Sequence, residues 1–573
     1  MTDLRLTWVQ PEDLVGHELR QAEEDGRDAK AVAERWHTAG GTTAPPRTGA
    51  SPAPAPPHLR ALAEELLDEL ALLPGPQEQY EPTELPAIRS SCPAWPAVRP
   101  GRGNGSAAPE ARTAVGRPAT PEPAAGRESV PAEGRPYARE GGTPAAPDRP
   151  HGPAEPAARG ETAPAGGRPG GPAARDLPYR TGDGTAASPG RPYGTSASSG
   201  PPYRTASAAA NGQEAAVHLT VARLHAAWLG RAVGCLLGKP VEKLPLTGIR
   251  ALARATGNWP LRTWFTAEGL PPGLAAAYPW NRRSAPTSLA ENIDGMPEDD
   301  DLNYPLLNLL LLRRHGRSFT TADVARVWLD ELPAGCTFTA ERVAYRNLLC
   351  GIEPPDTARY RNPFREWIGA AIRADVHGWT HPGAPGAAAA QAHREATLTH
   401  TANGVYGAMF VAGMIAAAAG PYITGPKDVH ACLRAGLSVV PPRSRLAGAV
   451  RFGVESAGEQ ADFAAVVDRI HSAYGHYHWV HSVPNAALLA AALTHADGDF
   501  GGSICRVVSG GWDTDSNGAT AGSVTGLLAG DPAALPERWT APLKNRLATS
   551  VAGFDGIGFD ALAELTHREA LRP

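Results

Sequence analysis

The chain lacks the cysteine pattern of an extracellular or zinc-binding protein and has no apolar run long enough to cross a membrane. Its six cysteines are scattered, with no C-x-x-C pair, so we expect neither a disulfide framework nor a zinc site. The most apolar stretch, residues 408–419, falls short of the roughly 20 residues that a membrane span requires. The first residues are acidic where a secretory signal needs an apolar run. We therefore expect a cytoplasmic protein without membrane contact.

Aromatic residues are also scarce, and the charge is close to balanced. Aromatics make up 6% of the chain, whereas glycine and proline number 63 and 57. So many turn-forming residues indicate that part of the chain forms no packed core. The net charge of -5 gives no overall attraction to nucleic acid or to an anionic membrane, and we expect direct binding to neither.

Residues 1–93 are predicted to form a short helical segment. Asp13 can cap a charged helical stretch that runs to Gly40 and Gly41. A second stretch, residues 59–73, carries leucines at steps of three and four, which gives it one apolar face. We expect that face to pack within this protein. The alternative is a protein partner.

Residues 94–215 are rich in proline, glycine, alanine and arginine and contain no lysine. With few branched apolar residues, this tract cannot bury enough surface to offset the entropy of ordering it, so we predict a disordered linker. Arg-Pro-Tyr phrases recur in it, at 135–137 and 191–193. Composition accounts for them, and a role as docking sites is the alternative.

Residues 216–573 are predicted to form one all-α domain, because apolar residues recur at helical spacing and no alternating strand pattern persists. The longer connections, residues 258–292 and 353–399, are expected to form loops at the rim of a cleft. The clearest helical patterns are Val221–Leu237, Leu302–Arg314, Thr321–Glu331, Val405–Ala419, Pro426–Ser438, Phe463–Ala473, Asn485–Ala496 and Asn517–Leu528.

Two acidic clusters each open a predicted helix. The first is Glu298, Asp299, Asp300 and Asp301, followed by an apolar run. We place Pro305 in the first helical turn, which puts these acids at the helix N-terminus. Capping uses one acid, and the helix dipole favours one more, at about 0.3–1 kcal/mol each. Four adjacent carboxylates therefore favour a bound divalent cation.

The second cluster is Asp513 and Asp515, followed by Ser516, in the string GGWDTDSNGATAG. Its oxygen ligands suit Mg²⁺, Mn²⁺ or Ca²⁺ better than zinc. Glycines recur every four residues after it, and also in GRAVGCLLGKPVE, so both helices can approach another backbone closely. For each cluster alone, capped helices with solvated acids are the simpler interpretation. Both together favour a metal site.

These elements resemble the ADP-ribosylglycohydrolase family, which includes the dinitrogenase-reductase-activating glycohydrolase and the ADP-ribosylarginine hydrolases. The matching stretches are GCLLGKPVE, EDDDLNYPLL, NGVYGAMFVAGM and a final one from His481 to Gly522, in the family's order. The resemblance implies an orthogonal all-α bundle. It also implies a centre of two Mg²⁺ or Mn²⁺ ions at the base of an ADP-ribose cleft.

Position by position, the resemblance implies roles for individual residues. Asp299 and Asp300 match the family's paired aspartates, Asp513 and Asp515 match its late ligands, and Ser516 stands where a threonine hydroxyl binds metal. Glu298 and Asp301, at positions where the family has threonines, are further candidate ligands. Glu242 matches a glutamate near the scissile bond and is the candidate catalytic base. The loop that embraces the diphosphate and distal ribose is matched by Asn403, Gly404 and Tyr406.

Two further positions depart from the family pattern. Cys235 replaces a common aspartate, and Trp512 replaces a glycine before the late acidic motif. We expect a metal-dependent hydrolase that cleaves ADP-ribose from a modified acceptor, with arginine favoured. The alternatives are a module that binds ADP-ribose without cleaving it, a hydrolase of another ribosyl compound, and a scaffold that recruits partners through residues 1–215.

Overall fold

The computed structural model describes residues 9–44, 54–96, 218–423 and 425–572. By their contacts, all of these residues belong to one compact unit. The predicted linker, residues 94–215, and its Arg-Pro-Tyr phrases lie almost wholly outside the described residues. The boundaries predicted at residues 93 and 215 therefore stay predictions.

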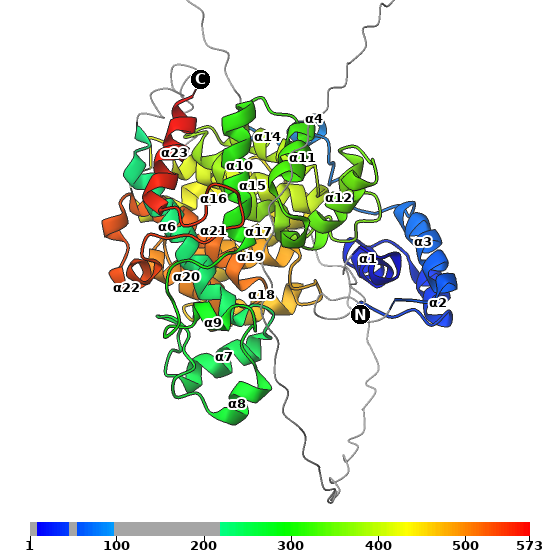
Figure 1. Cartoon of the computed structure of the whole chain (residues 1–573), viewed down its shortest axis with the longest axis horizontal. Coiled ribbons are helices and arrows are strands. Elements are labelled where there is room, and N and C mark those ends of the chain that lie inside the picture. The colour runs from blue at the N-terminus through cyan, green and yellow to red at the C-terminus, as the bar shows by residue number, and fades with distance from the viewer. Residues whose placement is uncertain (1–8, 45–53, 97–217, 424, 573) are drawn as a thin grey trace, which may run out of the picture. The chain divides into compact units, whose positions relative to one another are not determined.

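The described residues form helices and no β-strand, with only three isolated bridges, which confirms the all-α prediction (Figure 1). In residues 9–44 and 54–96, the described part of the N-terminal segment, the helices are α1 (Pro11–Asp25), α2 (Lys30–Thr38), α3 (Pro57–Ala71) and α4 (Leu85–Ser91). The helices from residue 221 onward are α6 (Val221–Gly238), α7 (Leu246–Ala255), α8 (Pro272–Ala277), α9 (Ala285–Ser288), α10 (Asp300–His315), α11 (Thr321–Glu331), α12 (Thr339–Leu349), α13 (Asp375–Trp379), α14 (Pro385–Ala396), α15 (Ala402–Ala418), α16 (Val429–Leu437), α17 (Arg445–Glu459), α18 (Phe463–Tyr474), α19 (Ser482–His495), α20 (Phe500–Ser509), α21 (Thr514–Ala529), α22 (Glu537–Thr540) and α23 (Phe559–Leu571).

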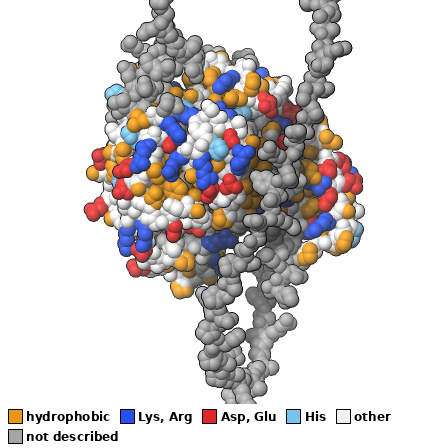
Figure 2. All heavy atoms as spheres, turned by 45° about the horizontal axis from the view of Figure 1, so that its top comes forward, with side chains coloured by type: hydrophobic (Ala, Val, Ile, Leu, Met, Phe, Trp, Pro, Cys, Tyr) orange, Lys and Arg blue, Asp and Glu red, His pale blue; other side chains and the backbone are white. Residues whose placement is uncertain are grey.

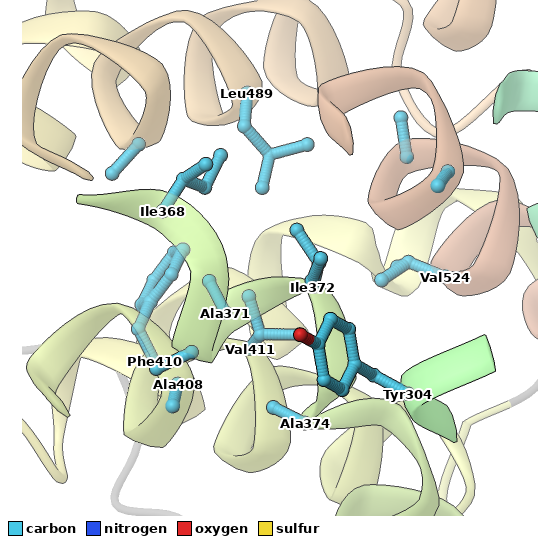
Figure 3. Close-up of a cluster of buried hydrophobic side chains, with 14 of the residues drawn as sticks. Tyr304, Ile368, Ala371, Ile372, Ala374, Ala408, Phe410, Val411, Leu489 and Val524 are labelled. Atoms are coloured by element: carbon cyan, nitrogen blue, oxygen red, sulfur yellow. The ribbon is translucent and has the colours of Figure 1, made fainter. Parts of the chain in front are cut away.

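The core is built from small and branched side chains of helices that are distant in sequence. Figure 3 shows Tyr304 of α10 beside Ala374 and Val411, with Ile372 and Val524 nearby. All five side chains are almost fully buried. Helix α15 is buried along its whole length because alanine, glycine and apolar residues surround its axis. A helix that is apolar all round belongs in the interior. None of the described helices is both long and apolar enough to span a membrane.

The first predicted helical stretch is wrong in its extent. Gly26 ends α1 with φ of 81°, and its amide and that of Arg27 donate to Glu23 and Ala22, so the chain turns before α2 begins. Glycine favours this left-handed end because it has no Cβ. Helix α1 also begins at Pro11, which places Asp13 inside its first turn.

The predicted apolar face of α3 packs within this chain. Leu66 and Leu70 are fully buried and join the same hydrophobic cluster as the helices after residue 221. Helices α1, α2 and α3 lie side by side (Figure 1). The prediction that the apolar face of this helix packs within the protein is therefore confirmed.

Residues 353–399 are not the rim loop that was predicted. They include two short 3₁₀ helices as well as α13 and α14, and most of their side chains are buried. The alanine-rich run before His393 forms α14. On the face shown in Figure 2, acidic and basic side chains are interspersed with apolar ones, as the nearly balanced net charge suggests.

Helices α6 and α21 pack backbone against backbone through their glycines. A Cβ added at Gly518 would lie 2.2 Å from the carbonyl oxygen of Gly234, and one at Gly522 would lie 1.9 Å from that of Gly230. No side chain larger than a hydrogen fits at such distances. The prediction from the four-residue glycine repeats is confirmed.

We expect Gly518→Ala to lower the free energy of unfolding by about 1–3 kcal/mol or more, because the added methyl group forces the two helices apart. Gly448→Ala is the matched control, since a Cβ at this glycine of α17 meets nothing within 4 Å. Replacing a helical glycine with alanine there should stabilise the protein by about 0.5–1 kcal/mol. Urea unfolding of both variants measures the difference. Equal stability of the two would contradict the close-packing argument.

Candidate active site

The glycine contact brings the second acidic cluster to the end of α6. A Cβ at Gly238 would lie 2.4 Å from the amide nitrogen of Asp515, and the Thr514 hydroxyl donates to the Gly238 carbonyl at 2.9 Å. Gly238 ends α6, and Lys239 and Glu242 follow it directly. The early glycine-rich motif and the late Asp-Thr-Asp motif therefore share one location, although about half of the chain separates them in sequence.

The first acidic cluster forms the N-terminus of α10. Asp299 caps the helix, because its Oδ1 accepts the Asp301 amide at 2.9 Å. Pro305 lies in the second helical turn and not in the first as predicted. Since proline has no N–H, the Asp301 carbonyl loses its helical donor. The Nε of Arg231 donates to this carbonyl instead, at 2.7 Å.

Arg231 is a fully buried arginine in the middle of α6. Its Nη2 lies 3.2 Å from Asp301 Oδ1, and its Nη1 lies 2.9 Å from Asp375 Oδ2. A buried guanidinium with these partners ties α6, α10 and α13 together. Sequence reasoning missed Arg231, although a lone charge at a buried position of an apolar helix is a usable signal for such a pair.

Lys239 is a second buried cation that the sequence analysis did not single out. Its Nζ forms an ion pair with Asp299 Oδ2, and both side chains are less than a tenth exposed. Burial alone would raise the pKa of Asp299, but the ammonium holds it below its ordinary value. Asp299, Asp301 and Cys235 can each offer one ligand atom within 4.8 Å of the others. Two of these three already contact Lys239 or Arg231.

Asp300, Asp513 and Asp515 have a different environment. Among the described residues, no lysine, arginine or histidine forms an ion pair with any of them. Burial and then the charge of Asp299 raise the pKa of Asp300 well above its ordinary value, with Asp301, Asp515 and Glu242 adding to the effect. Like charges that are close and poorly solvated favour binding of a proton or a cation.

The late pair shows the same effect. Burial, followed by Asp515, raises the pKa of Asp513 well above its ordinary value. Burial, with Glu242 and Asp299 as the next causes, raises the pKa of Asp515 to about 7. The structure therefore brings Asp299, Asp300, Asp513, Asp515 and Glu242 close enough to interact.

Glu242 is held at the edge of this group. Asn281 Nδ2 donates to its Oε2 at 2.7 Å, and Lys243 Nζ lies 2.8 Å from its Oε1. Its side chain is 17% exposed, so solvent reaches it. An anchored carboxylate that water can reach is suited to proton transfer.

The remaining predicted site residues lie in different surroundings. Glu298 is exposed, and its Oε1 accepts from the Asn303 amide and from the Ser550 backbone, at 3.1 and 3.2 Å. Ser516 follows Asp515 in the first turn of α21 and is 8% exposed. Asn403 and Tyr406 are fully buried in α15.

The departure at Trp512 has a structural counterpart. This residue has φ of 56°, a left-handed conformation that favours glycine. Its indole stacks on the His471 ring with 3.8 Å between centroids and an interplanar angle of 4°. Trp512 directly precedes Asp513, so the stacking on His471 of α18 lies next to the late acidic motif.

Comparison with known proteins identifies the family. The protein-family model described as ADP-ribosylglycohydrolase matches residues 216–571 of the sequence. The chain belongs to the ADP-ribosylglycohydrolase family. This confirms the resemblance seen in the motifs and assigns the chain to a family of hydrolases of ADP-ribose linkages.

Two further comparisons give less. No curated protein matches the chain. A solved structure described as an ADP-ribosylglycohydrolase-related protein complex is similar to it, at 21% identity, covering 61% of this chain and 98% of the other, with a TM-score of 0.38.

We expect Arg231→Met to lower the free energy of unfolding by about 3–5 kcal/mol, because it leaves Asp301 and Asp375 buried without their cation. Arg313→Met is the control, since Arg313 is an exposed arginine of α10 and its loss should cost less than about 0.5 kcal/mol. Denaturant unfolding of both variants tests the difference. A loss for Arg231→Met as small as that for Arg313→Met would rule out a structural role for the buried pair.

Proposed function

We propose that this protein is a metal-dependent hydrolase that cleaves the glycosidic bond between ADP-ribose and a modified acceptor. One observation carries the proposal: Asp300, Asp513 and Asp515 lie close enough to Glu242 and its neighbouring acids to interact, and no basic side chain of the described residues forms an ion pair with these three aspartates. Three such carboxylates require compensating positive charge. Their oxygens, with the neighbouring Ser516 hydroxyl, suit Mg²⁺ or Mn²⁺.

The protein residues divide the chemistry between binding and proton transfer. Asp300, Asp513 and Asp515 would hold the metal, and Ser516 would add a hydroxyl ligand. When bound, the metal would polarise and orient hydroxyl groups of the ribose and the attacking water. Glu242 would accept the proton of that water as the bond at the anomeric carbon breaks. Asn281 and Lys243 would keep the Glu242 carboxylate in position.

Arginine is the acceptor that we favour. The acidic residues at the site attract a cationic group, and ADP-ribosylarginine hydrolases are among the enzymes whose motifs the chain resembles. The direct test incubates the protein with arginine-linked and serine-linked ADP-ribose conjugates, with Mg²⁺ and with chelator. Faster release of ADP-ribose from the serine conjugate than from the arginine conjugate would contradict arginine as the acceptor. Full activity in the presence of chelator would contradict metal dependence.

We expect Asp300→Ala and Asp515→Ala each to lower turnover more than about 100-fold. Loss of a residue that orients a metal ligand lowers activity or metal affinity by about 10–100-fold, and loss of a direct ligand should lower it at least as much. Metal affinity, measured by calorimetry with Mn²⁺, should fall in parallel while helical content is kept. Asp330→Ala is the control, since this exposed aspartate of α11 lies outside the acidic clusters. Unchanged turnover in either site variant would refute the assignment.

Lys239 bears on the number of ions. The resemblance implies two, but the Lys239 ammonium already neutralises Asp299. We propose that Asp300, Asp513 and Asp515 take the first ion and that Lys239 weakens binding of a second at Asp299. Lys239→Met should therefore bind a second Mn²⁺ at least about tenfold more tightly, a change of about 1.4 kcal/mol. Two equally tight ions in the unaltered protein would contradict this proposal, as would no gain in the variant.

A further inference from the structure

The N-terminal segment, here residues 9–44 and 54–96, contacts the start of α15, where the residues expected to embrace the diphosphate lie. The Tyr406 hydroxyl donates to the Pro82 carbonyl. The amide of Ala402, the first residue of α15, donates to the Thr83 hydroxyl at 3.4 Å. This amide belongs to the first turn of a helix, where N–H groups have no partner within the helix and can bind an anion. The segment therefore uses the position that a phosphate would use.

Acidic side chains of the segment form ion pairs with arginines next to the N-terminus of α15. The carboxylate of Glu81 accepts from the Arg445 backbone amide and from its guanidinium, both at 2.7 Å. The carboxylate of Glu18 accepts from Arg365 at 2.8 Å. Glu81 and Glu18 are 7% and 4% exposed. Guanidinium groups bind phosphate and carboxylate in the same way, because both anions present paired oxygens.

These contacts connect to the acidic cluster at Asp513 through a series of polar groups. Glu366 accepts from Arg445 and from the Asn403 amide, each at 2.8 Å, and lies 3.9 Å from the His481 ring. The Asn485 side chain donates to the His481 carbonyl and accepts the Asp513 amide, at 2.8 and 3.1 Å. The segment and the acidic cluster therefore lie at opposite ends of one polar path.

A cavity of about 260 Å³ remains beside the seated carboxylates. Residues of the segment and of the helices after residue 221 line it together, among them Arg27, Arg365 and Arg445 and the start of α15 at Thr401 and Ala402. A small polar ligand could enter there only partly while Glu18 and Glu81 occupy the arginines. A ligand as long as ADP-ribose would have to displace them.

We propose that the N-terminal segment is an autoinhibitory cover, in which the carboxylates of Glu81 and Glu18 replace the diphosphate of ADP-ribose at Arg445, Arg365 and the N-terminus of α15. The proposal rests on the proposed function, since it assumes that ADP-ribose binds at Asn403, Gly404 and Tyr406. Binding and docking of the segment then exclude each other. The observed affinity is the intrinsic affinity multiplied by the fraction of molecules whose segment is undocked.

The test measures the affinity of the full chain for free ADP-ribose by calorimetry, with hydrogen exchange of α1 and α3 in parallel. The double variant Glu18→Gln/Glu81→Gln removes both charges while keeping the size of the side chains. It should bind ADP-ribose at least about tenfold more tightly than the unaltered chain. Glu34→Gln, at an exposed glutamate of α2, is the matched control and should leave the affinity unchanged.

Hydrogen exchange keeps the proposal testable without any variant. Saturating ADP-ribose should speed exchange in α1 and α3 of the unaltered chain, because the segment must leave. Saturation with exchange unchanged or slower would overturn the proposal. A second outcome would also overturn the proposal. If the segment of the double variant is shown to be released, and this variant binds ADP-ribose no more tightly than the unaltered chain, then the segment does not compete with the ligand.

The two failures can be told apart. If ADP-ribose binds and the segment does not respond, only the autoinhibitory proposal fails. If neither the unaltered chain nor the double variant binds or hydrolyses ADP-ribose conjugates in Mg²⁺, the proposed function fails and the cover proposal fails with it.

Discussion

The backbone contact between α6 and α21 is the constraint on which the site depends. Two helices with glycine at every fourth position can approach closely enough for the carbonyl of one to meet the α-carbon of the other. This approach fixes Asp513 and Asp515 against the end of α6, where Lys239 begins a short 3₁₀ turn and Glu242 follows its end. Each acid motif would be an ordinary helix terminus without it. The close contact turns two distant termini into one poorly solvated group of carboxylates.

Charge within this group is distributed unevenly, and the imbalance defines what the site can bind. Arg231 and Lys239 reach Asp301 and Asp299 from α6 and from the turn after it. The same element therefore brings both the cations and the close contact with α21. Asp300, Asp513 and Asp515 have no such ion pair among the described residues, and burial together with neighbouring carboxylates raises their pKa values, which shows that the charged forms are unfavourable there. A divalent ion offsets this cost while a monovalent side chain offsets only part of it.

Much of this could be predicted from the sequence because it depends on local patterns. Leucine spacing predicted α3, apolar periodicity predicted α6, α10 and α21, and the glycine repeats predicted a close helix contact. The pairing of Lys239 with Asp299 could not be predicted, since it depends on how α10 meets the end of α6. The break at Gly26 was missed because charged residues continue on both sides of it, so the composition does not change where the helix ends. The cover formed by Glu18 and Glu81 arises from tertiary contacts that no spacing encodes.

Trp512 shows how one residue can tie together two parts of the chain that are otherwise unrelated. Its left-handed backbone is strained for any residue with a Cβ, and its indole lies flat on the His471 ring of α18. Because the stacking helps to hold the turn before Asp513, a smaller residue at position 471 removes support from a conformation that only glycine adopts freely. The two positions are therefore expected to change together in evolution, with glycine at 512 freeing position 471 to vary.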